Sequence, residues 1–423
     1  MQKLNTFGSK PGLSRISRLL ELMGNPEKDL KMVHVGGTNG KGSVTCMIAS
    51  LLSAAGYRVG HFSSPHLHSY TERFTIDGQE IQPEHFKAYL DDIEGRIDLM
   101  ARAGEEHPTE FEIMTALAFQ YFKDSQVDLA VIEVGLGGIY DSTNVITPLV
   151  SVISSIDYDH TEVLGSTLAE IAQNKAGIIK AGIPVVIGPM PEEARKVIQS
   201  RTQSLKAPCF NLDSIKIIPT GRPGIEGQEI EIDLDGQRME GVQLGLAGNY
   251  QLENLRLALG AIIILKESRF ILTPMVLRDS LRNLQIPGRL EVLSQHPMVI
   301  VDVGHNPQAA RALAESLSSI LGARKKILLC GYLDDKDAGK ALAYLGENTS
   351  RCIVSRPESD RATKWDRVAE EWNKTYPEIQ CYVQEDIGKA VRLGIQLLDK
   401  EEYLLITGSF YLLDRARRQF TIA

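Results

Sequence analysis

Hydrophobic and polar positions in the first half of the chain follow two rhythms. Short apolar runs typical of buried strands alternate with longer segments that have helical periodicity. The strand-like runs are Met32–Val35, Tyr57–Phe62, Leu129–Val134 and Leu149–Ile156. A helix is expected over Ser43–Ala55, with Gly56 placed as its C-terminal glycine. Apolar strands that alternate with helices predict βα units and therefore a parallel sheet.

A second alternating series begins after Ile286–Arg289. Its expected strands are Met298–Val303, Ile327–Cys330, Cys352–Ser355 and Tyr403–Thr407. A helix is expected over Pro307–Leu321, because proline suits the first turn of a helix. Between the two series, residues 213–246 alternate with turn residues, which predicts a small antiparallel insert. We therefore place a boundary near residues 287–296 and expect two domains, 1–290 and 291–423.

Composition narrows the class of protein. The 423 residues are 43% hydrophobic and 24% charged, which excludes gross disorder and fits two or three domains. The net charge of −8 argues against nucleic-acid binding but not against small anionic ligands. Five scattered cysteines without a CxxC pair predict reduced thiols and no zinc site. The sequence contains no signal-peptide pattern and no apolar run of roughly 20 residues, so we expect a cytoplasmic protein without a membrane partner.

The segment HVGGTNGKGS, from His34 to Ser43, places a glycine-rich turn between a predicted strand and a predicted helix. Backbone N–H groups in such a turn surround phosphate oxygens, and the helix N-terminus adds partial positive charge. Lys41 can reach the β- and γ-phosphates of a nucleotide, and Ser43 can offer its hydroxyl to Mg²⁺. Gly42, between the lysine and the serine, departs from the common P-loop pattern. An ordinary glycine-rich turn with a surface lysine is the alternative, and the clustering of these residues favours a nucleoside triphosphate site.

These features define the expected fold class, which is α/β. The first domain should be a P-loop-containing parallel-sheet domain with a small antiparallel insert. The second should be a smaller Rossmann-like domain. Because the second domain lacks a GxGxxG motif, nothing in it favours a dinucleotide.

Two further strand ends carry candidate metal ligands. Glu133 lies at the end of an apolar strand, in AVIEVGLGG, and a carboxylate at the C-terminal edge of a parallel strand faces the ligand crevice of an α/β protein. The alternative is a charge that escapes to solvent. His160 follows another strand together with Asp157 and Asp159 and can reach the same crevice. A purely structural histidine is the alternative there.

Lys175 has an unusual position. The spacing of Thr167 and Glu170 fits a capping box for a helix that runs to about Lys180. Lys175 falls within the apolar face of this helix, whereas Lys180 lies at its end. The functional interpretations are a buried cation that faces phosphate and a lysine modified to a carboxylate-like metal ligand. The alternative is a packed aliphatic stem with its ammonium in water.

The segment VDVGHNP places Asp302, His305 and Asn306 between a strand and a helix. We expect Asp302 and His305 to face the crevice between the domains, with turn chemistry as the alternative. Asn306 stands before Pro307, which favours helix capping.

Ten motifs in order resemble the folylpolyglutamate synthase/dihydrofolate synthase family of Mur-type ATP-dependent amide ligases. They are GLSRISRLLELMGNP, HVGGTNGKGS, SSPHLHSYTERF, EFEIMTALAFQYF, EVGLGG-x-x-D-S-T-N, DYDHTEVLGSTLAEIAQNKAGIIK, GNYQLEN, PGRLEV, DVGHNP and TGSFYLL. The resemblance implies a monomeric, ATP-dependent ligase with two Mg²⁺ ions. Its reaction would add L-glutamate to the terminal carboxylate of a folate through an acyl phosphate, or also join glutamate to dihydropteroate.

The resemblance also implies roles for individual residues. Lys41, Lys175 as a carbamoylated lysine, and His305 would take part in catalysis. The nucleotide would contact Thr38, Asn39, Gly40, Lys41, Gly42, Ser43, Asn254, Arg289 and Asp302. The magnesium ligands would be Ser43, Ser64, Glu133 and His160. The folate side of the site would be bordered by Ser64, Pro65, His66, Thr109 and Glu112, and the incoming glutamate would meet Asp302 and His305.

This chain departs from the family at two positions. Ile139 stands where the family has arginine, which puts some substrate contacts in doubt, and Asn174 stands where it has glutamate. A related Mur-type ligase that acts on a cell-wall precursor is the alternative, although SSPHL and YTERF favour folate. A P-loop switch or motor would need neither Lys175 near Glu133 and His160 nor a second domain with DVGHNP.

Overall fold

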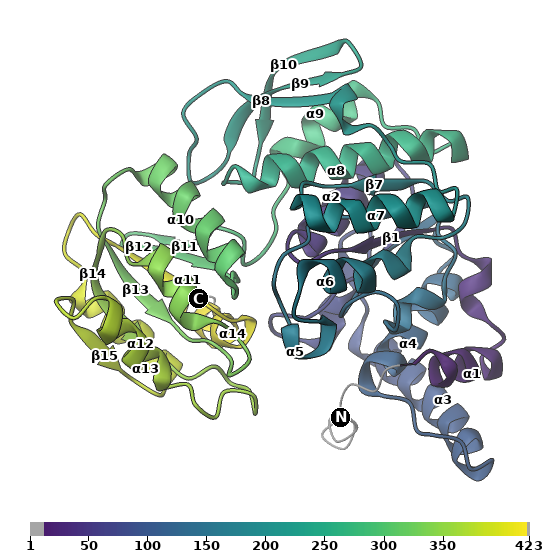
Figure 1. The fold of residues 1–423 in the computed structure, drawn as a ribbon, viewed down its shortest axis with the longest axis horizontal. Helices are drawn as coiled ribbons and strands as arrows, with labels where there is room; N and C mark the ends of the chain where they lie inside the picture. The colour runs from purple at the N-terminus through teal and green to yellow at the C-terminus, as the bar shows by residue number, and fades with distance from the viewer. Residues whose placement is uncertain (1–11, 421–423) are drawn as a thin grey trace. The chain divides into compact units, whose positions relative to one another are not determined.

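The computed structural model describes residues 12–420, and its internal contacts divide it into two units (Figure 1). The first unit runs to residue 216 and includes 253–280, and the second contains 217–252 and the chain from 281 onward. The division at residue 290 stays a proposal. Residues 1–11, which contribute to the expectation of no signal peptide, lie outside the described range.

A seven-stranded sheet organises the first unit, with the strand order β4-β3-β2-β5-β1-β6-β7. Its strands are β1 Met32–Gly36, β2 Val59–Phe62, β3 Phe74–Ile76, β4 Gln79–Glu80, β5 Leu129–Glu133, β6 Val150–Ile153 and β7 Val185–Ile187. Five strands, β2, β5, β1, β6 and β7, pair in parallel, and four of them were predicted. The sequence analysis missed β7 and the antiparallel edge that β3 and β4 add. Because β1 lies between β5 and β6, the segments that follow these three strands emerge at one edge of the sheet.

Helices of the first unit lie along this sheet (Figure 1). Their apolar side chains are buried against it. The α-helices are α1 Ser14–Leu22, α2 Lys41–Ala54, α3 Pro83–Arg102, α4 Glu110–Asp124, α5 Thr161–Leu164, α6 Leu168–Lys175, α7 Glu192–Ser204, α8 Tyr250–Leu265 and α9 Pro274–Arg282, the last two extending into the second unit. One apolar cluster joins α1, α3 and α4 to the sheet, and another joins α6 and α7 to it. Short 3₁₀ turns are η2 Pro26–Asp29, η3 Tyr70–Arg73, η4 Ser142–Val145, η5 Ala176–Ile178, η6 Leu212–Ser214 and η7 Lys266–Ser268.

The second unit contains two sheets. An antiparallel sheet, most of which belongs to this unit, has the order β10-β9-β8, with β8 Ile215–Pro219, β9 Gln228–Leu234 and β10 Gln237–Leu244. The predicted antiparallel insert is therefore confirmed, but most of its contacts are with the second unit. The six-stranded sheet has the order β11-β12-β16-β13-β14-β15 and is parallel except at β11. Its strands are β11 Glu291–Gln295, β12 Met298–Asp302, β13 Lys326–Cys330, β14 Thr349–Val354, β15 Cys381–Val383 and β16 Tyr403–Thr407.

The helices of the second unit alternate with these strands, as the sequence predicted. They are α10 Pro307–Leu321, α11 Ala338–Leu345, α12 Arg367–Thr375, α13 Ile387–Leu397 and α14 Phe410–Arg418. The predicted bounds of α10 are confirmed, and Asn306 caps it by accepting a hydrogen bond from the Ala309 N–H at 2.9 Å. In the described part of the chain, no helix is both long and apolar enough to cross a bilayer.

The capping box predicted for α6 is confirmed, but the helix ends earlier than expected. The Thr167 side chain accepts a hydrogen bond from the Glu170 N–H, and the Glu170 carboxylate accepts one from the Thr167 N–H. The regular helix ends at Lys175 and continues only as η5. A β-carbon on Gly177 would lie 2.5 Å from Ile139 Cα, so a close approach of two backbones accompanies this end of the helix.

His34 is a fully buried histidine in β1. Its Nε2 lies 2.8 Å from Thr143 Oγ1. Burial, together with the positive charge of Lys180, lowers the pKa of His34 from 6.5 to about 3. The folded protein therefore holds this ring neutral at pH values where an exposed histidine becomes protonated.

Replacing His34 by glutamine should remove an acid-sensitive contribution to stability. Between pH 6.5 and the folded pKa near 3, the unfolded chain binds the proton that the folded chain excludes, so stability falls as the pH falls. This group alone should cost about 2 kcal/mol between pH 6.5 and 5. Urea unfolding at pH 7 and at pH 5 should show that the free energy of unfolding falls by about 2 kcal/mol more in wild type than in His34→Gln.

A matched control is His85→Gln, because His85 is exposed on α3. This variant should follow the wild-type dependence on pH. Equal losses in wild type and His34→Gln would contradict the assignment of a neutral His34.

Candidate active site

The glycine-rich loop connects β1 to α2, as the sequence predicted. It leaves β1 at Gly36 and enters α2 at Lys41, so the helix begins two residues before the predicted Ser43. Gly37 and Gly40 have φ values of 141° and 87°, which disfavour other residues. A β-carbon on Gly37 would lie 2.1 Å from Ser154 Oγ, and one on Gly40 would lie 2.4 Å from Asn254 Oδ1. Both glycines are therefore required by close approach as well as by conformation, and the loop presents the N-terminus of α2.

Residues that follow β6 hold this loop in place. The Ser154 hydroxyl donates to the Asn39 carbonyl at 2.6 Å, and the Asn39 N–H donates to Ser155 Oγ at 3.0 Å. The Thr38 N–H donates to the Ser155 carbonyl at 2.8 Å, and the Thr38 hydroxyl accepts from the Asp157 N–H at 3.1 Å. These contacts explain why β6 ends at Ile153, three residues before the predicted end. The sequence analysis missed Ser154 and Ser155, although a Ser-Ser pair directly after a buried strand is a visible signal.

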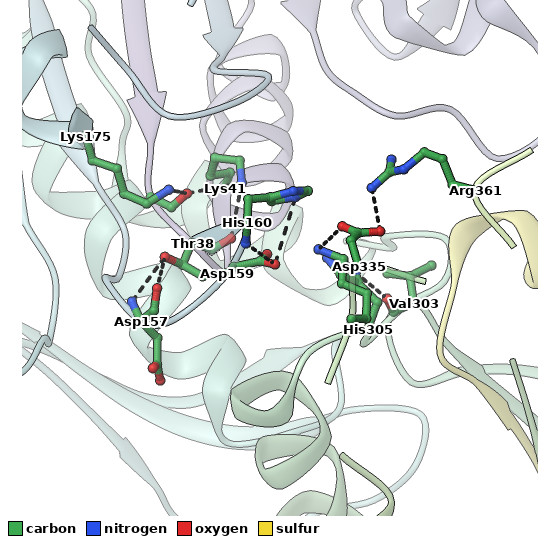
Figure 2. Close-up of polar contacts among 12 residues, drawn as sticks. Thr38, Lys41, Asp157, Asp159, His160, Lys175, Val303, His305, Asp335 and Arg361 are labelled. Carbon is green, nitrogen blue, oxygen red and sulfur yellow. Dashed lines mark hydrogen bonds and ion pairs between the residues drawn. The ribbon is translucent and has the colours of Figure 1, made fainter. Parts of the chain in front are cut away.

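Two lysines meet at one carbonyl of the loop. Lys175 Nζ donates to the Gly37 carbonyl at 2.9 Å, and Lys41 Nζ donates to the same oxygen and to the Thr38 carbonyl, each at 3.2 Å. Figure 2 shows both side chains pointing at the loop. Lys175 is only 4% exposed, so its ammonium does not reach water. The alternative, in which the aliphatic stem packs against the protein and the ammonium lies in water, is therefore wrong. A residue of α6 thus contacts the predicted phosphate loop, 138 positions earlier in the sequence.

Glu133, at the end of β5, is also buried, at 4% exposure. Its carboxylate accepts a hydrogen bond from the Ser64 N–H at 3.3 Å, so the structure brings together two of the four predicted magnesium ligands. The alternative prediction, a Glu133 carboxylate exposed to solvent, is therefore wrong. Ser43, a third predicted ligand, is buried in the first turn of α2.

His160 has a left-handed backbone conformation directly before α5, with φ at 49°. Its N–H donates to Asp159 Oδ1 at 3.0 Å, and its ring Nε2 lies 3.9 Å from the same oxygen (Figure 2). Among residues 12–420, no three His, Cys, Asp or Glu side chains are grouped to hold a metal ion. Because the predicted magnesium set includes two serines, that finding does not test it, and the four ligands stay a prediction.

The predicted folate-binding segment contains a packed cluster of rings and charge. Arg73 Nε donates to His66 Nδ1 at 2.9 Å, and the His66 ring lies 4.5 Å from that of Tyr70. Because a guanidinium can only donate, His66 Nδ1 is unprotonated and the neutral ring carries its proton on Nε2. His66 therefore has one N–H donor, Nε2–H, with which to bind an acceptor. Arg73 was missed as a positioning residue because no local pattern links it to His66.

Thr109 and Glu112 form the capping box of α4 and are buried. Glu112 Oε2 accepts from the Thr109 N–H at 2.6 Å and from Arg15 Nε at 3.1 Å. These contacts give both residues a structural function. Their contact with substrate stays a prediction, as does that of Pro65.

The second unit holds Arg289, Asp302 and His305. Asp302, at the end of β12, accepts hydrogen bonds from the Gly304 N–H at 2.7 Å and the Leu290 N–H at 3.0 Å. Burial raises the pKa of its carboxyl, and the nearby guanidinium of Arg289 opposes that shift. Arg289 in turn lies over the ring of Phe410, 5.8 Å from its centroid.

His305 is oriented by its own loop. Its Nδ1 lies 3.0 Å from the Val303 carbonyl, which can only accept, so Nδ1 carries a proton and donates. Elsewhere in the second unit, the Asp335 carboxylate pairs with Arg361 at 2.8 Å (Figure 2) and lies 3.7 Å from the Lys336 ammonium.

Comparisons with known proteins agree with this arrangement. Residues 35–262 match the Mur ligase middle domain, and residues 288–410 match the glutamate ligase domain of Mur ligases. The chain is 34% identical over 418 residues to the dihydrofolate synthase/folylpolyglutamate synthase of Bacillus subtilis strain 168, covering 98% of this chain and 96% of that protein.

Solved structures agree in fold over almost the whole chain. Folylpolyglutamate synthase of Mycobacterium tuberculosis, complexed with ADP and AMPPCP, has a TM-score of 0.92 and 31% identity, covering 100% of this chain and 97% of that one. Escherichia coli FolC in complex with DHPP and ADP has a TM-score of 0.86 and 28% identity, covering 99% and 95%.

Replacing Arg15 by alanine should destabilise the first unit. It would leave the Glu112 carboxylate, whose side chain is 5% exposed, without its guanidinium partner. Breaking a buried pair in this way costs about 3 kcal/mol or more. Urea unfolding at pH 7 should measure this loss.

Arg18→Ala is the matched control, because Arg18 lies on the same helix but pairs with Glu21 and Glu105 at the surface. Its stability should hardly change. If both variants unfolded at the same urea concentration as wild type, the structural function of Glu112 would be refuted.

Proposed function

This chain belongs to the dihydrofolate synthase/folylpolyglutamate synthase family of Mur-type ligases, and we propose that it uses ATP to join L-glutamate to the terminal carboxylate of a folate. It is an ATP-dependent ligase. The observation that carries the proposal is the match to relatives of this activity over nearly their whole length. The same reaction with dihydropteroate as acceptor would yield dihydrofolate.

The chemical problem is the activation of a carboxylate. A carboxylate resists attack by an amine because oxide is a poor leaving group. Transfer of the γ-phosphoryl group of ATP to it gives an acyl phosphate with a good leaving group. The α-amine of glutamate then attacks the acyl carbon, phosphate leaves, and an amide forms. Such a transfer depends mainly on positioning and charge neutralisation.

The glycine-rich loop would bind the triphosphate. Its conformation is held by Ser154 and Ser155, so the N–H groups at the start of α2 need little reordering when phosphate arrives. Lys41 now donates to two carbonyls of its own loop and would exchange them for phosphate oxygens. Asn254, which lies against Gly40, would contribute to nucleotide binding on the same side of the loop.

Magnesium fits the residues near this loop. Ser43, Ser64 and Glu133 offer hard oxygen donors, which Mg²⁺ prefers, and Glu133 is buried beside the backbone of Ser64. His160 would complete the proposed set of protein ligands. When bound, Mg²⁺ would neutralise charge on the phosphate and acceptor oxygens.

Lys175 would act in a carbamoylated form. Burial disfavours a charged ammonium, and the neutral amine is the form that adds CO₂. A carbamate keeps one N–H, so the hydrogen bond to the Gly37 carbonyl would survive the modification. The new carboxylate would replace a positive charge by a negative one next to the phosphate loop, where it would attract rather than repel a metal ion.

Residues around the two substrates have distinct proposed functions. His66 would offer Nε2–H to an acceptor on the folate side, in an orientation fixed by Arg73. In the second unit, Asp302 and Arg289 would contact the nucleotide. His305, with Nδ1–H held by the Val303 carbonyl, would direct Nε2 at the amine of glutamate. We propose that the protein acts as a monomer.

Phosphate release from ATP and Mg²⁺ should require both glutamate and an acceptor. Release with tetrahydrofolate and with dihydropteroate would indicate both ligase activities, and release with one alone would restrict the chain to that activity. Mixtures that lack glutamate or acceptor serve as controls and should stay at background. Binding of ATP without release in any mixture would contradict the proposal and favour a ligase for a cell-wall precursor.

Lys175→Ala should lower turnover by at least about 100-fold, because a ligand beside the phosphate loop is lost. ATP binding and the melting temperature should change little. Lys180→Ala is the matched control, since Lys180 lies five residues on and donates to the Asn144 carbonyl at 2.8 Å. Near-normal turnover of Lys175→Ala, with Lys180→Ala also active, would rule out the carbamate.

A further inference from the structure

Three of the five cysteines lie side by side in the six-stranded sheet of the second unit. Cys330 ends β13, Cys352 lies in β14, and Cys381 begins β15. In the strand register, Cys352 is the direct partner of Cys381, while Cys330 pairs with the residue two positions beyond Cys352. Because side chains two positions apart share a face of a sheet, all three thiols lie on one face. All three belong to or pack against the same apolar cluster.

The three thiols differ in accessibility. The Cys381 thiol donates a hydrogen bond to the Tyr382 carbonyl at 3.9 Å. Cys330 and Cys352 are fully buried, whereas Cys381, in the strand at the edge of the sheet, is partly exposed. The neighbouring Cys352 side chain lowers the pKa of the Cys381 thiol, and burial raises the pKa of Cys352 well above its ordinary value. Cys381 is therefore the thiol that meets solvent and ionises more readily, and Cys352 is the buried residue paired with it on the next strand.

We propose that Cys381 and Cys352 form a peroxide-reactive thiol pair that closes to a disulfide. The Cys381 thiolate attacks one oxygen of hydrogen peroxide, the O–O bond breaks, and hydroxide leaves to give a sulfenic acid. The Cys352 sulfur then attacks the Cys381 sulfur and loses its proton, and the sulfenic hydroxyl leaves as water. In total, two thiols are oxidised to one disulfide, and one peroxide is reduced to two water molecules.

The register selects this pair over the other. Neighbouring strands lie about 4.8 Å apart, so directly paired residues fall within the Cα separation of about 4.4–6.8 Å that a disulfide spans. Cys330 meets Cys352 diagonally and is buried, so peroxide would reach it last. The alternative is that all three thiols serve only as small apolar side chains in the core and are inert. The proposal does not depend on the proposed ligase activity, and it is tested without measuring turnover.

The test is to expose the full-length folded protein to hydrogen peroxide, alkylate the remaining thiols, and map the cysteines by peptide mass spectrometry. Two of the five thiols should be lost, a peptide pair linking Cys352 and Cys381 should appear, and dithiothreitol should restore both. Cys209 is an internal reference, because it is exposed and belongs to the first unit. If exposure alone governed reactivity, Cys209 would be oxidised first and the linked pair would be absent, which would overturn the proposal.

Variants separate the two steps. In Cys352→Ala, oxidation of Cys381 should stop at the sulfenic acid, which dimedone traps, and no disulfide should form. In Cys381→Ser, Cys352 should stay reduced. Cys209→Ser is the matched control and should form the linked pair as wild type does. A disulfide between Cys330 and Cys352, or free thiols at both Cys352 and Cys381 in oxidised wild type, would contradict the assignment whether or not the variants fold.

Discussion

The Gly37 carbonyl is the contact on which the candidate site depends. It accepts hydrogen bonds from Lys41, within the glycine-rich loop, and from Lys175, at the end of α6. The contacts with Ser154 and Ser155 hold the loop in the conformation that presents this carbonyl to both lysines. The loop is therefore supported by residues outside its own segment, including a helix that is distant in sequence.

Burial of charge is the second constraint, and it explains why these residues need one another. Glu133, Lys175 and Asp302 are each about 4% exposed, and an isolated buried charge is strongly unfavourable. Each instead forms hydrogen bonds with backbone groups of a neighbouring segment: Ser64, Gly37 and Leu290, respectively. Each of these side chains would destabilise the core if it had no partner. Through these hydrogen bonds they instead hold neighbouring backbone segments together near the ends of strands. The chain keeps them where phosphate and metal chemistry would use them.

Much of this arrangement could be predicted from the sequence, because it depends on local patterns of residues. The strands β1, β5 and β6, the glycine-rich loop, the caps at Thr167 and Asn306, and the place of Lys175 on an apolar face all follow from spacing within a few residues. The early end of β6, the edge strands β3 and β4, and the pairing of Arg73 with His66 do not. Each depends on contacts between segments, which hydrophobic periodicity does not encode. The antiparallel insert was predicted as a structure but assigned to the first domain, because sequence order says nothing about which unit it contacts.

The two departures from the family pattern lie beside each other. The Ile139 N–H donates to the Asn174 carbonyl at 3.0 Å, and a β-carbon on Gly137 would lie 2.5 Å from Asn174 Oδ1. This hydrogen bond joins backbone groups, so it does not depend on the side chains that residues 139 and 174 carry. Isoleucine and asparagine are both uncharged, so neither adds a charge next to buried Lys175, where an isolated charge would be strongly unfavourable.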